Sequence, residues 1–206
     1  MLKKLLLALL VLLLIAAGVV LYFWTQATAL PDWYEPEGEA AVAEASPEES
    51  GADTRGLQWQ PAKDEGEGAM EVRGFHRKAP LLKGESRKAI RASRAVRTKD
   101  KLEAGVVVDT SKISKQEMSK RDNATLERAL EAFPGLTQRD VYIGVEDTPV
   151  TKDGVLQLSP KARLRVGNLT YSLADAAKRM GIPESKLRDD LNKQLQKMDA
   201  KDPQAG

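Results

Sequence analysis

The stretch LLLALLVLLLIAAGVVLYFW occupies residues 5–24, from Leu5 to Trp24, and contains no charged residue. As an α-helix these twenty residues would extend about 30 Å, which matches the hydrocarbon thickness of a bilayer. Backbone polar groups inside a bilayer must hydrogen-bond within their own segment, so a lone apolar segment crosses it as a helix. Tyr22, Phe23 and Trp24 end the stretch, and aromatic rings favour the headgroup region. The sequence therefore predicts one transmembrane helix over residues 5–24.

The charges that flank this stretch predict its orientation. Lys3 and Lys4 precede it, whereas the first basic residue after it is Arg55. Because basic residues favour the cytoplasmic side, residues 1–4 are expected in the cytoplasm and the bulk of the chain outside it, at an inner (plasma) membrane. The alternative is a signal peptide removed after Ala29, because Ala-Thr-Ala has the small-x-small form of a cleavage site. Both interpretations export the rest of the chain.

Charge is segregated along the next part of the chain, although the whole chain carries a net charge of only +2. Residues 31–72 hold twelve acidic and two basic residues, a net charge of −10, and residues 73–101 hold eleven basic and two acidic residues, a net charge of +9. Residues 35–69 are rich in Glu, Ala, Pro, Gly and Ser, which bury too little surface to offset the entropy of ordering. We therefore expect residues 25–71 to form a juxtamembrane segment and a disordered acidic linker. A flexible coil of about 35 residues spans about 30–35 Å, so the folded part would lie near the membrane without being pressed against it.

The basic segment, residues 72–101, is predicted to be partly helical. A helix over residues 85–97 would place Ala89, Ile90, Ser93 and Val96 on one face and most of the arginines on the other. One interpretation is a solvated helix face that the acidic linker partly neutralises. Another is contact with an anionic surface, such as lipid headgroups or an envelope polymer, through Lys83, Arg87, Lys88, Arg91, Arg94 and Arg97. Nucleic acid is not expected, because this segment lies outside the cytoplasm and has few aromatic residues for stacking.

Residues 102–200 are expected to form a small α+β domain, followed by a tail at residues 201–206. The β-branched run at residues 105–108 predicts a first strand. Alternating apolar residues then predict antiparallel strands over 140–147, 154–159, 162–167 and 168–171, with a hairpin turn at Asp153-Gly154. The fold class is thus α+β, with an antiparallel sheet of three or four strands that amphipathic helices cover on one face.

Four helical patterns could supply this cover. The capping-box pattern of Ser114 and Glu117 predicts a helix start near Lys115, and a second pattern runs over residues 126–133. Ser172 is expected to cap a third helix, which ends at Gly181, and residues 183–198 form the fourth pattern.

Residues 172–195 resemble a helix-turn-helix DNA-binding unit, with a small residue at Ala177 and the turn glycine at Gly181. The resemblance departs from the usual pattern at Asp190, where an apolar residue is expected. The second helix has no excess of positive charge to attract phosphate: Glu184, Asp189 and Asp190 oppose Lys186, Arg188 and Lys193. An αα-hairpin that packs on the sheet is the alternative interpretation.

No pattern in the sequence indicates catalysis. The chain has no Cys, and its single histidine, His76, is expected on a loop or the surface. A Cys nucleophile and a His- or Cys-based metal site are therefore excluded, and there is no Gly-rich phosphate loop. We expect no catalytic residue, no cofactor and no metal site.

These observations predict a non-enzymatic, single-pass, membrane-anchored extracytoplasmic protein. Its small α+β domain would interact with an envelope protein or an anionic envelope surface. One alternative is an extracytoplasmic carrier or binder of a lipid or another apolar ligand, held between sheet and helices. Another is a transmembrane DNA-binding regulator, which would need the C-terminal part in the cytoplasm.

Overall fold

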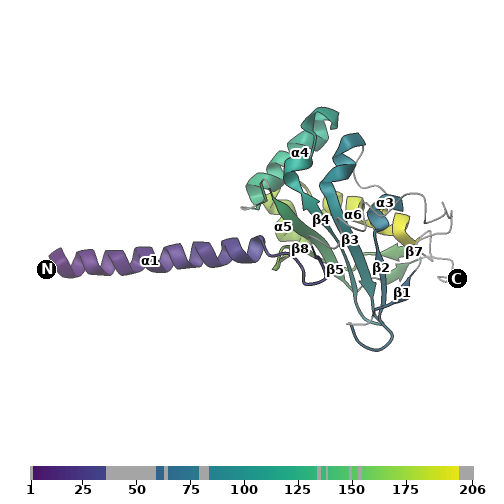
Figure 1. Ribbon diagram of the computed structural model, residues 1–206, viewed down its shortest axis with the longest axis horizontal. Helices are drawn as coiled ribbons and strands as arrows, with labels where there is room; N and C mark the ends of the chain where they lie inside the picture. The colour runs from purple at the N-terminus through teal and green to yellow at the C-terminus, as the bar shows by residue number, and fades with distance from the viewer. Residues whose placement is uncertain are drawn as a thin grey trace.

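A long helix, α1 (Leu2–Ala27), extends away from a folded α+β body in this computed structural model (Figure 1). The structure describes the following residues: 2–35, 59–62, 65–78, 84–133, 136–137, 139–148, 150–152 and 155–199. Side chains of α1 are described from Val11 onward. Within these described ranges, no helix combines the length and the apolar character that crossing a membrane requires.

The body is built on a seven-stranded sheet in the order β1-β2-β3-β4-β5-β8-β9. Every pair of neighbours is antiparallel. The strands are β1 (Gln60–Pro61), β2 (Met70–Arg73), β3 (Ile90–Arg97), β4 (Leu102–Asp109), β5 (Asp140–Asp147), β8 (Arg163–Val166) and β9 (Leu169–Ser172). The expected sheet of three or four strands was therefore too small, because residues 60–97 add three strands to one edge.

Residues 85–97 do not form one helix, although the basic segment contains short helical stretches. A 3-10 helix, η1 (Gly84–Ala89), is followed there by β3, and a short helix, α3 (Phe75–Lys78), precedes them. β3 lies between β2 and β4, so its backbone groups pair on both sides. The C-terminal part of the basic segment is thus an interior strand of the sheet.

Part of the predicted linker is also structured. β1 lies inside residues 35–69, and β2 begins directly after them. Both strands join the sheet. Residues 36–58 of the predicted linker lie outside the described residues.

The C-terminal half largely agrees with the sequence. β5 has the predicted bounds. β6 (Val150–Lys152) pairs with β7 (Val155–Gln157) as a hairpin that forms a separate two-stranded sheet, so the strand predicted over residues 154–159 is not part of the main sheet. The two residues between β6 and β7 lie outside the described part. The helix α5 (Leu173–Arg179) begins after Ser172, whose hydroxyl accepts the Asp175 N–H at 3.0 Å, and α6 (Glu184–Asp199) follows.

The predicted capping box does not form. Ser114 precedes only a 3-10 turn, η3 (Lys115–Glu117), and its side chain makes no cap hydrogen bond. Another such turn, η2 (Thr110–Lys112), comes earlier. The helix α4 (Lys120–Ala132) contains most of the second predicted pattern, residues 126–133.

The sheet has two different faces, because side chains alternate along each strand. The helix face packs with α4, α5 and α6 in the main core, whose buried members include Val141, Leu164, Phe133, Leu173 and Leu195. α5 and α6 therefore pack in one apolar core with the sheet, as an αα-hairpin does. We call the opposite side of the sheet the outer face, and it carries Glu103, Gly105, Tyr142, Gly144 and Arg165.

Candidate functional site

The chain that leaves α1 crosses the outer face of the sheet. We call residues 28–35 the strap. Leu30, Trp33 and Tyr34 of the strap pack in one cluster with Tyr142. The Trp33 and Tyr142 rings meet edge to face, with centroids 6.0 Å apart, and the Tyr34 hydroxyl donates to Asp140 Oδ2 at 3.2 Å. The aromatic residues after the apolar stretch thus hold the chain against the folded body.

Two glycines form the floor under Tyr142. Gly105 of β4 pairs directly with Gly144 of β5. A Cβ atom added to either glycine would lie 2.4 Å or 2.6 Å, respectively, from the Tyr142 hydroxyl oxygen. Only glycine lets the ring lie flat across both strands at these positions. The strap therefore binds to a surface that is shaped by the paired glycines.

An ion pair fixes the hydroxyl end of Tyr142. The hydroxyl donates to Glu103 Oε1 at 3.1 Å, and Arg165 Nη1 lies 2.9 Å from the same oxygen. The Arg165 guanidinium carbon also lies 5.3 Å from the centre of the Tyr142 ring. Burial, and then the negative charge of Glu103, raise the pKa of Tyr142, so its hydroxyl remains a donor at neutral pH.

Glu103 itself is ionised in this arrangement. Burial opposes its charge, but Lys101, Arg165 and the Tyr142 hydroxyl together lower the pKa of Glu103 below its ordinary value. A charged carboxylate therefore anchors the Tyr142 side of the strap-binding surface.

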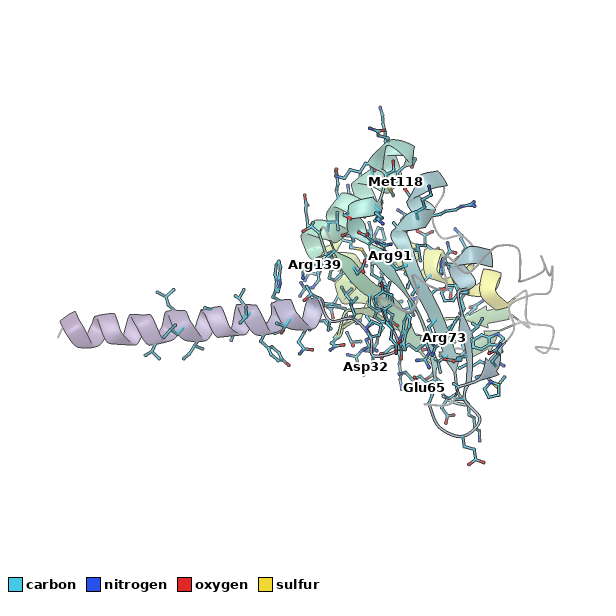
Figure 2. The ribbon with its side chains drawn as sticks, in the orientation of Figure 1. Asp32, Glu65, Arg73, Arg91, Met118 and Arg139 are labelled. Atoms are coloured by element: carbon cyan, nitrogen blue, oxygen red, sulfur yellow. The ribbon has the colours of Figure 1, made fainter. Side chains whose placement is uncertain are left out.

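The end of α1 contacts the turn between β8 and β9. The Asn168 N–H donates to the Gln26 carbonyl at 2.8 Å. Gly167 has φ +57°, and a Cβ there would lie 2.5 Å from the carbonyl oxygens of both Gln26 and Ala27. Figure 2 shows Arg139 beside this end of α1, with its guanidinium carbon 5.3 Å from the Trp24 ring centre. The helix and the folded body thus meet through backbone contacts and one stacked cation.

The described residues among those predicted to contact an anionic surface have different surroundings. Arg91 lies 2.7 Å from Asp109, and Arg97 stacks on the Trp59 ring at 5.4 Å. Arg87 is exposed on η1. Lys88 is also exposed there, whereas Lys83 lies outside the described residues.

Arg94 is the clearest departure from that prediction, because only 7% of it is exposed. It lies 2.6 Å from Glu71 and 3.0 Å from Glu65. Burial opposes its charge, but these two carboxylates raise the pKa of Arg94. The charge of Arg94 is therefore neutralised by carboxylates of the fold itself.

A pocket of about 180 Å³ lies on the helix face, between the sheet and α6. Its lining is apolar except for Gln194 and includes Phe75, Val106, Ile143, Leu158, Leu191 and Leu195. An apolar cavity of about 150 Å³ can stay free of water and accept a benzene-sized group. The pocket therefore has the size and character to hold a short apolar group.

Two polar pairs resemble parts of catalytic sites, but their serines are buried. His76 is half-buried in α3 and not on a loop, and its Nδ1 lies 2.8 Å from Ser93 Oγ. Ser93 is only 1% exposed, and its hydroxyl also accepts the His76 backbone N–H at 3.1 Å. Asp147 accepts the Ser159 N–H at 2.7 Å and is 6% exposed. Neither serine is accessible to a substrate, and in the described part of the chain no group of acidic or histidine side chains is placed to hold a metal.

Sequence reasoning did not find the strap or its binding surface. The run Val-Tyr-Ile-Gly-Val at residues 141–145 contains the signal, because alternation places Tyr142 and Gly144 on the same face. A glycine inside a strand often marks a close approach by another group. The partner glycine, Gly105, becomes visible only when the register of β4 and β5 is known.

Comparisons with protein-family models, with curated proteins and with solved structures found no match.

Proposed function

We propose that this chain is a non-enzymatic, single-pass, membrane-anchored protein of the inner membrane. Residues 5–24 cross the bilayer, the N-terminus is cytoplasmic, and the α+β body lies on the extracytoplasmic side. The body would interact there with an envelope protein or an anionic envelope component. The burial of Ser93 and Ser159, and the absence of a Cys nucleophile, support the non-enzymatic part of this proposal.

The exposure of α1 carries the proposal. Eleven large apolar side chains of this helix are 42–66% exposed, and they run from Val11 to Trp24. Each buried large apolar side chain gains about 1.5–3 kcal/mol relative to water, so this helix would lose on the order of 10 kcal/mol in water. The proposed span also includes residues 5–10, whose side chains lie outside the described part of α1. The apolar run itself has twenty uncharged residues.

A topology experiment tests the proposal. Alkaline phosphatase, which is active outside the cytoplasm, and green fluorescent protein, which fluoresces inside it, are each fused after Gly206. We expect phosphatase activity and no fluorescence. We also expect the protein to resist extraction by carbonate, and the unfused chain to have its full mass of 22.6 kDa. A carbonate-soluble chain, or a fluorescent C-terminus, would contradict the proposal. Replacing Lys3 and Lys4 with Glu is the matched control, because it should weaken the orientation without changing the apolar run.

The partner is tested with the full chain in detergent. Cross-linking followed by capture from an envelope extract should recover one reproducible protein or an anionic polymer. Recovery of neither would count against the proposed interaction of the body with an envelope component.

The apolar pocket favours a second function, the binding of an apolar ligand on the helix face. The ligand class would be one with a short unbranched chain, because the pocket volume of about 180 Å³ leaves room for only a few methylene groups. The single polar lining side chain, Gln194, offers one amide to a carbonyl or hydroxyl group of such a ligand.

Mass spectrometry of the purified full chain tests this second function. We expect a lipid or another apolar molecule to co-purify with the wild type. Leu191→Trp fills the pocket and should abolish co-purification, whereas Lys193→Trp on the exposed side of α6 should not. The same yield of ligand from both variants would contradict binding in this pocket.

A further inference from the structure

The contacts between α1 and the body determine how far the body lies from the bilayer. Gln26 and Ala27, which contact the Gly167-Asn168 turn, lie two and three residues beyond Trp24. At a rise of about 1.5 Å per residue this separation is about 3–5 Å along the helix. The headgroup region on each side of a bilayer is about 5–7 Å thick. If the apolar run ends at the edge of the hydrocarbon, the Gly167-Asn168 turn lies within the headgroup layer.

We propose that the body sits directly on the extracytoplasmic surface of the bilayer, in one orientation, and that Arg139 binds the phosphate of an anionic lipid there. This inference rests on the proposed membrane anchor. It replaces the expected flexible tether with a docked arrangement. It also moves the lipid contact from the basic segment to the end of the sheet where β5 begins.

The docked arrangement is supported at three separate points. The Gln26 carbonyl accepts the Asn168 N–H at 2.8 Å, Ala27 is 6% exposed, and the strap continues into the aromatic cluster around Tyr142. A contact through backbone groups resists rotation better than a contact through long side chains, because no rotamer freedom remains. The strap also restricts the movement of the body relative to α1, which a flexible linker would allow.

Arg139 has the chemistry and the position for an anionic headgroup. Its side chain is exposed and its guanidinium stacks on Trp24, which ends the apolar run. Among the described residues Arg139 forms no ion pair, in contrast to Arg91 and Arg94. Guanidinium groups bind phosphate oxygens through two parallel hydrogen bonds. Figure 2 places Arg139 where α1 meets the body, whereas Glu65 and Arg73 lie farther from the helix.

Fluorescence quenching in vesicles tests the arrangement with the full chain. The chain contains no Cys, so single labels can be placed at Thr137→Cys, near Arg139, and at Asp100→Cys, in the turn between β3 and β4. β5 separates these two ends of the sheet by about 24 Å. The vesicles contain phosphatidylglycerol and phosphatidylcholine, with a nitroxide on a fraction of the headgroups. We expect strong quenching of the label at position 137 and little quenching at position 100.

Gly167→Ala should break the docking. The new methyl group would clash with two α1 carbonyls, and alanine disfavours φ +57°. Quenching at position 137 should fall toward the level at position 100 while the chain stays in the vesicles. Gly181→Ala is the matched control, because Gly181 has φ +62° with no neighbour within 4 Å of the added atom. This control should keep the quenching, and near-ultraviolet circular dichroism checks that both variants remain folded.

Arg139→Gln tests the lipid contact separately. In the wild type, quenching at position 137 should increase with the phosphatidylglycerol fraction, and the variant should lose this dependence. Equal dependence in both proteins would overturn the role of Arg139. Equal weak quenching at positions 137 and 100 in vesicle-bound wild type would overturn the docked arrangement but leave the anchor intact. Release of the chain from floated vesicles would instead contradict the proposed anchor.

Discussion

Gly144→Ala should destabilise the folded body by about 2–3 kcal/mol, although a glycine-to-alanine change inside a strand usually stabilises. The added Cβ would lie 2.6 Å from the hydroxyl oxygen of Tyr142 and 2.9 Å from its ring carbon Cζ. Tyr142 is 1% exposed and has no room to move toward Gly105, where a Cβ would lie even closer. The ring must therefore tilt away from the sheet, toward Trp33.

The magnitude follows from the contacts that this tilt would weaken. Overpacking at a close-packed site costs about 1–3 kcal/mol. Lengthening the hydrogen bond from Tyr142 to Glu103 adds up to about 1.5–3 kcal/mol, because its acceptor is charged. The edge-to-face contact with Trp33 contributes about 0.5–1.5 kcal/mol. Alanine recovers about 0.4–1 kcal/mol by reducing the entropy of the unfolded chain. A partial loss of each contact gives about 2–3 kcal/mol.

Urea denaturation of the full chain in micelles, followed by tryptophan fluorescence, measures this free energy. A double-mutant cycle with Tyr142→Leu identifies its cause, because the smaller side chain removes the clash. In that background Gly144→Ala should cost less than about 0.5 kcal/mol. The same cost in both backgrounds would refute the contact with the Tyr142 ring. Gly18→Ala on α1, with no neighbour within 4 Å of the added atom, is the neutral control.

Three further changes test other contacts. Burial opposes the charge of Glu103, but nearby cations lower its pKa below the ordinary 4.5. Its ionisation therefore stabilises the fold above about pH 4.5, and this stabilisation is lost as the pH falls through the lower folded pKa. Glu103→Gln should reduce the slope of stability against pH in that acidic range, as pH-dependent urea titrations would show. Asp147→Ala should cost about 2–3 kcal/mol by leaving two buried donors of Ser159 unpaired, measurable as a lower urea midpoint. Arg94→Met should cost about 2–3 kcal/mol in the same assay, because it leaves two carboxylates without a buried partner. The control Arg73→Met, at a 49% exposed side chain, should cost under about 1 kcal/mol.

Local patterns predicted the elements whose signals lie within a few residues. β5 shows strict alternation, and its bounds were correct. β6 and β7 pair on either side of the predicted hairpin position, residues 153–154, which lies outside the described residues, and α5 begins at a serine that caps it. In each case the residues that determine the element lie within it or next to it, so no partner distant in the sequence is needed.

β3 was misread because its determinants are distant in the sequence. Its arginines repeat every three residues at Arg91, Arg94 and Arg97, which resembles the polar side of a helix. Arg94 can lie in the sheet because Glu65 and Glu71 neutralise it there. The sequence contains both acidic residues but does not indicate that they meet Arg94, so the period of the charges suggested the wrong element.

The strap was missed for a related reason. Trp33 and Tyr34 follow an apolar run, and aromatic residues at that place usually serve as interfacial anchors. The Tyr142 ring, which rests on Gly105 and Gly144, offers these side chains an alternative site on the body. That site exists only once β4 and β5 are paired in register, so composition near the apolar run could not indicate it.

The segregation of charge along the chain has a different meaning once the sheet is formed. β2, from the acidic part, lies beside β3, from the basic part, so residues such as Glu71 and Arg94 become neighbours. Among the described residues, Glu65 and Glu71 of the acidic part therefore neutralise Arg94 of the basic part. Less basic charge is left on β3 to attract an anionic surface than the sequence suggests. Arg139 lies outside both charge blocks and has no acidic partner among the described residues, which is why we propose it, and not β3, as the lipid contact.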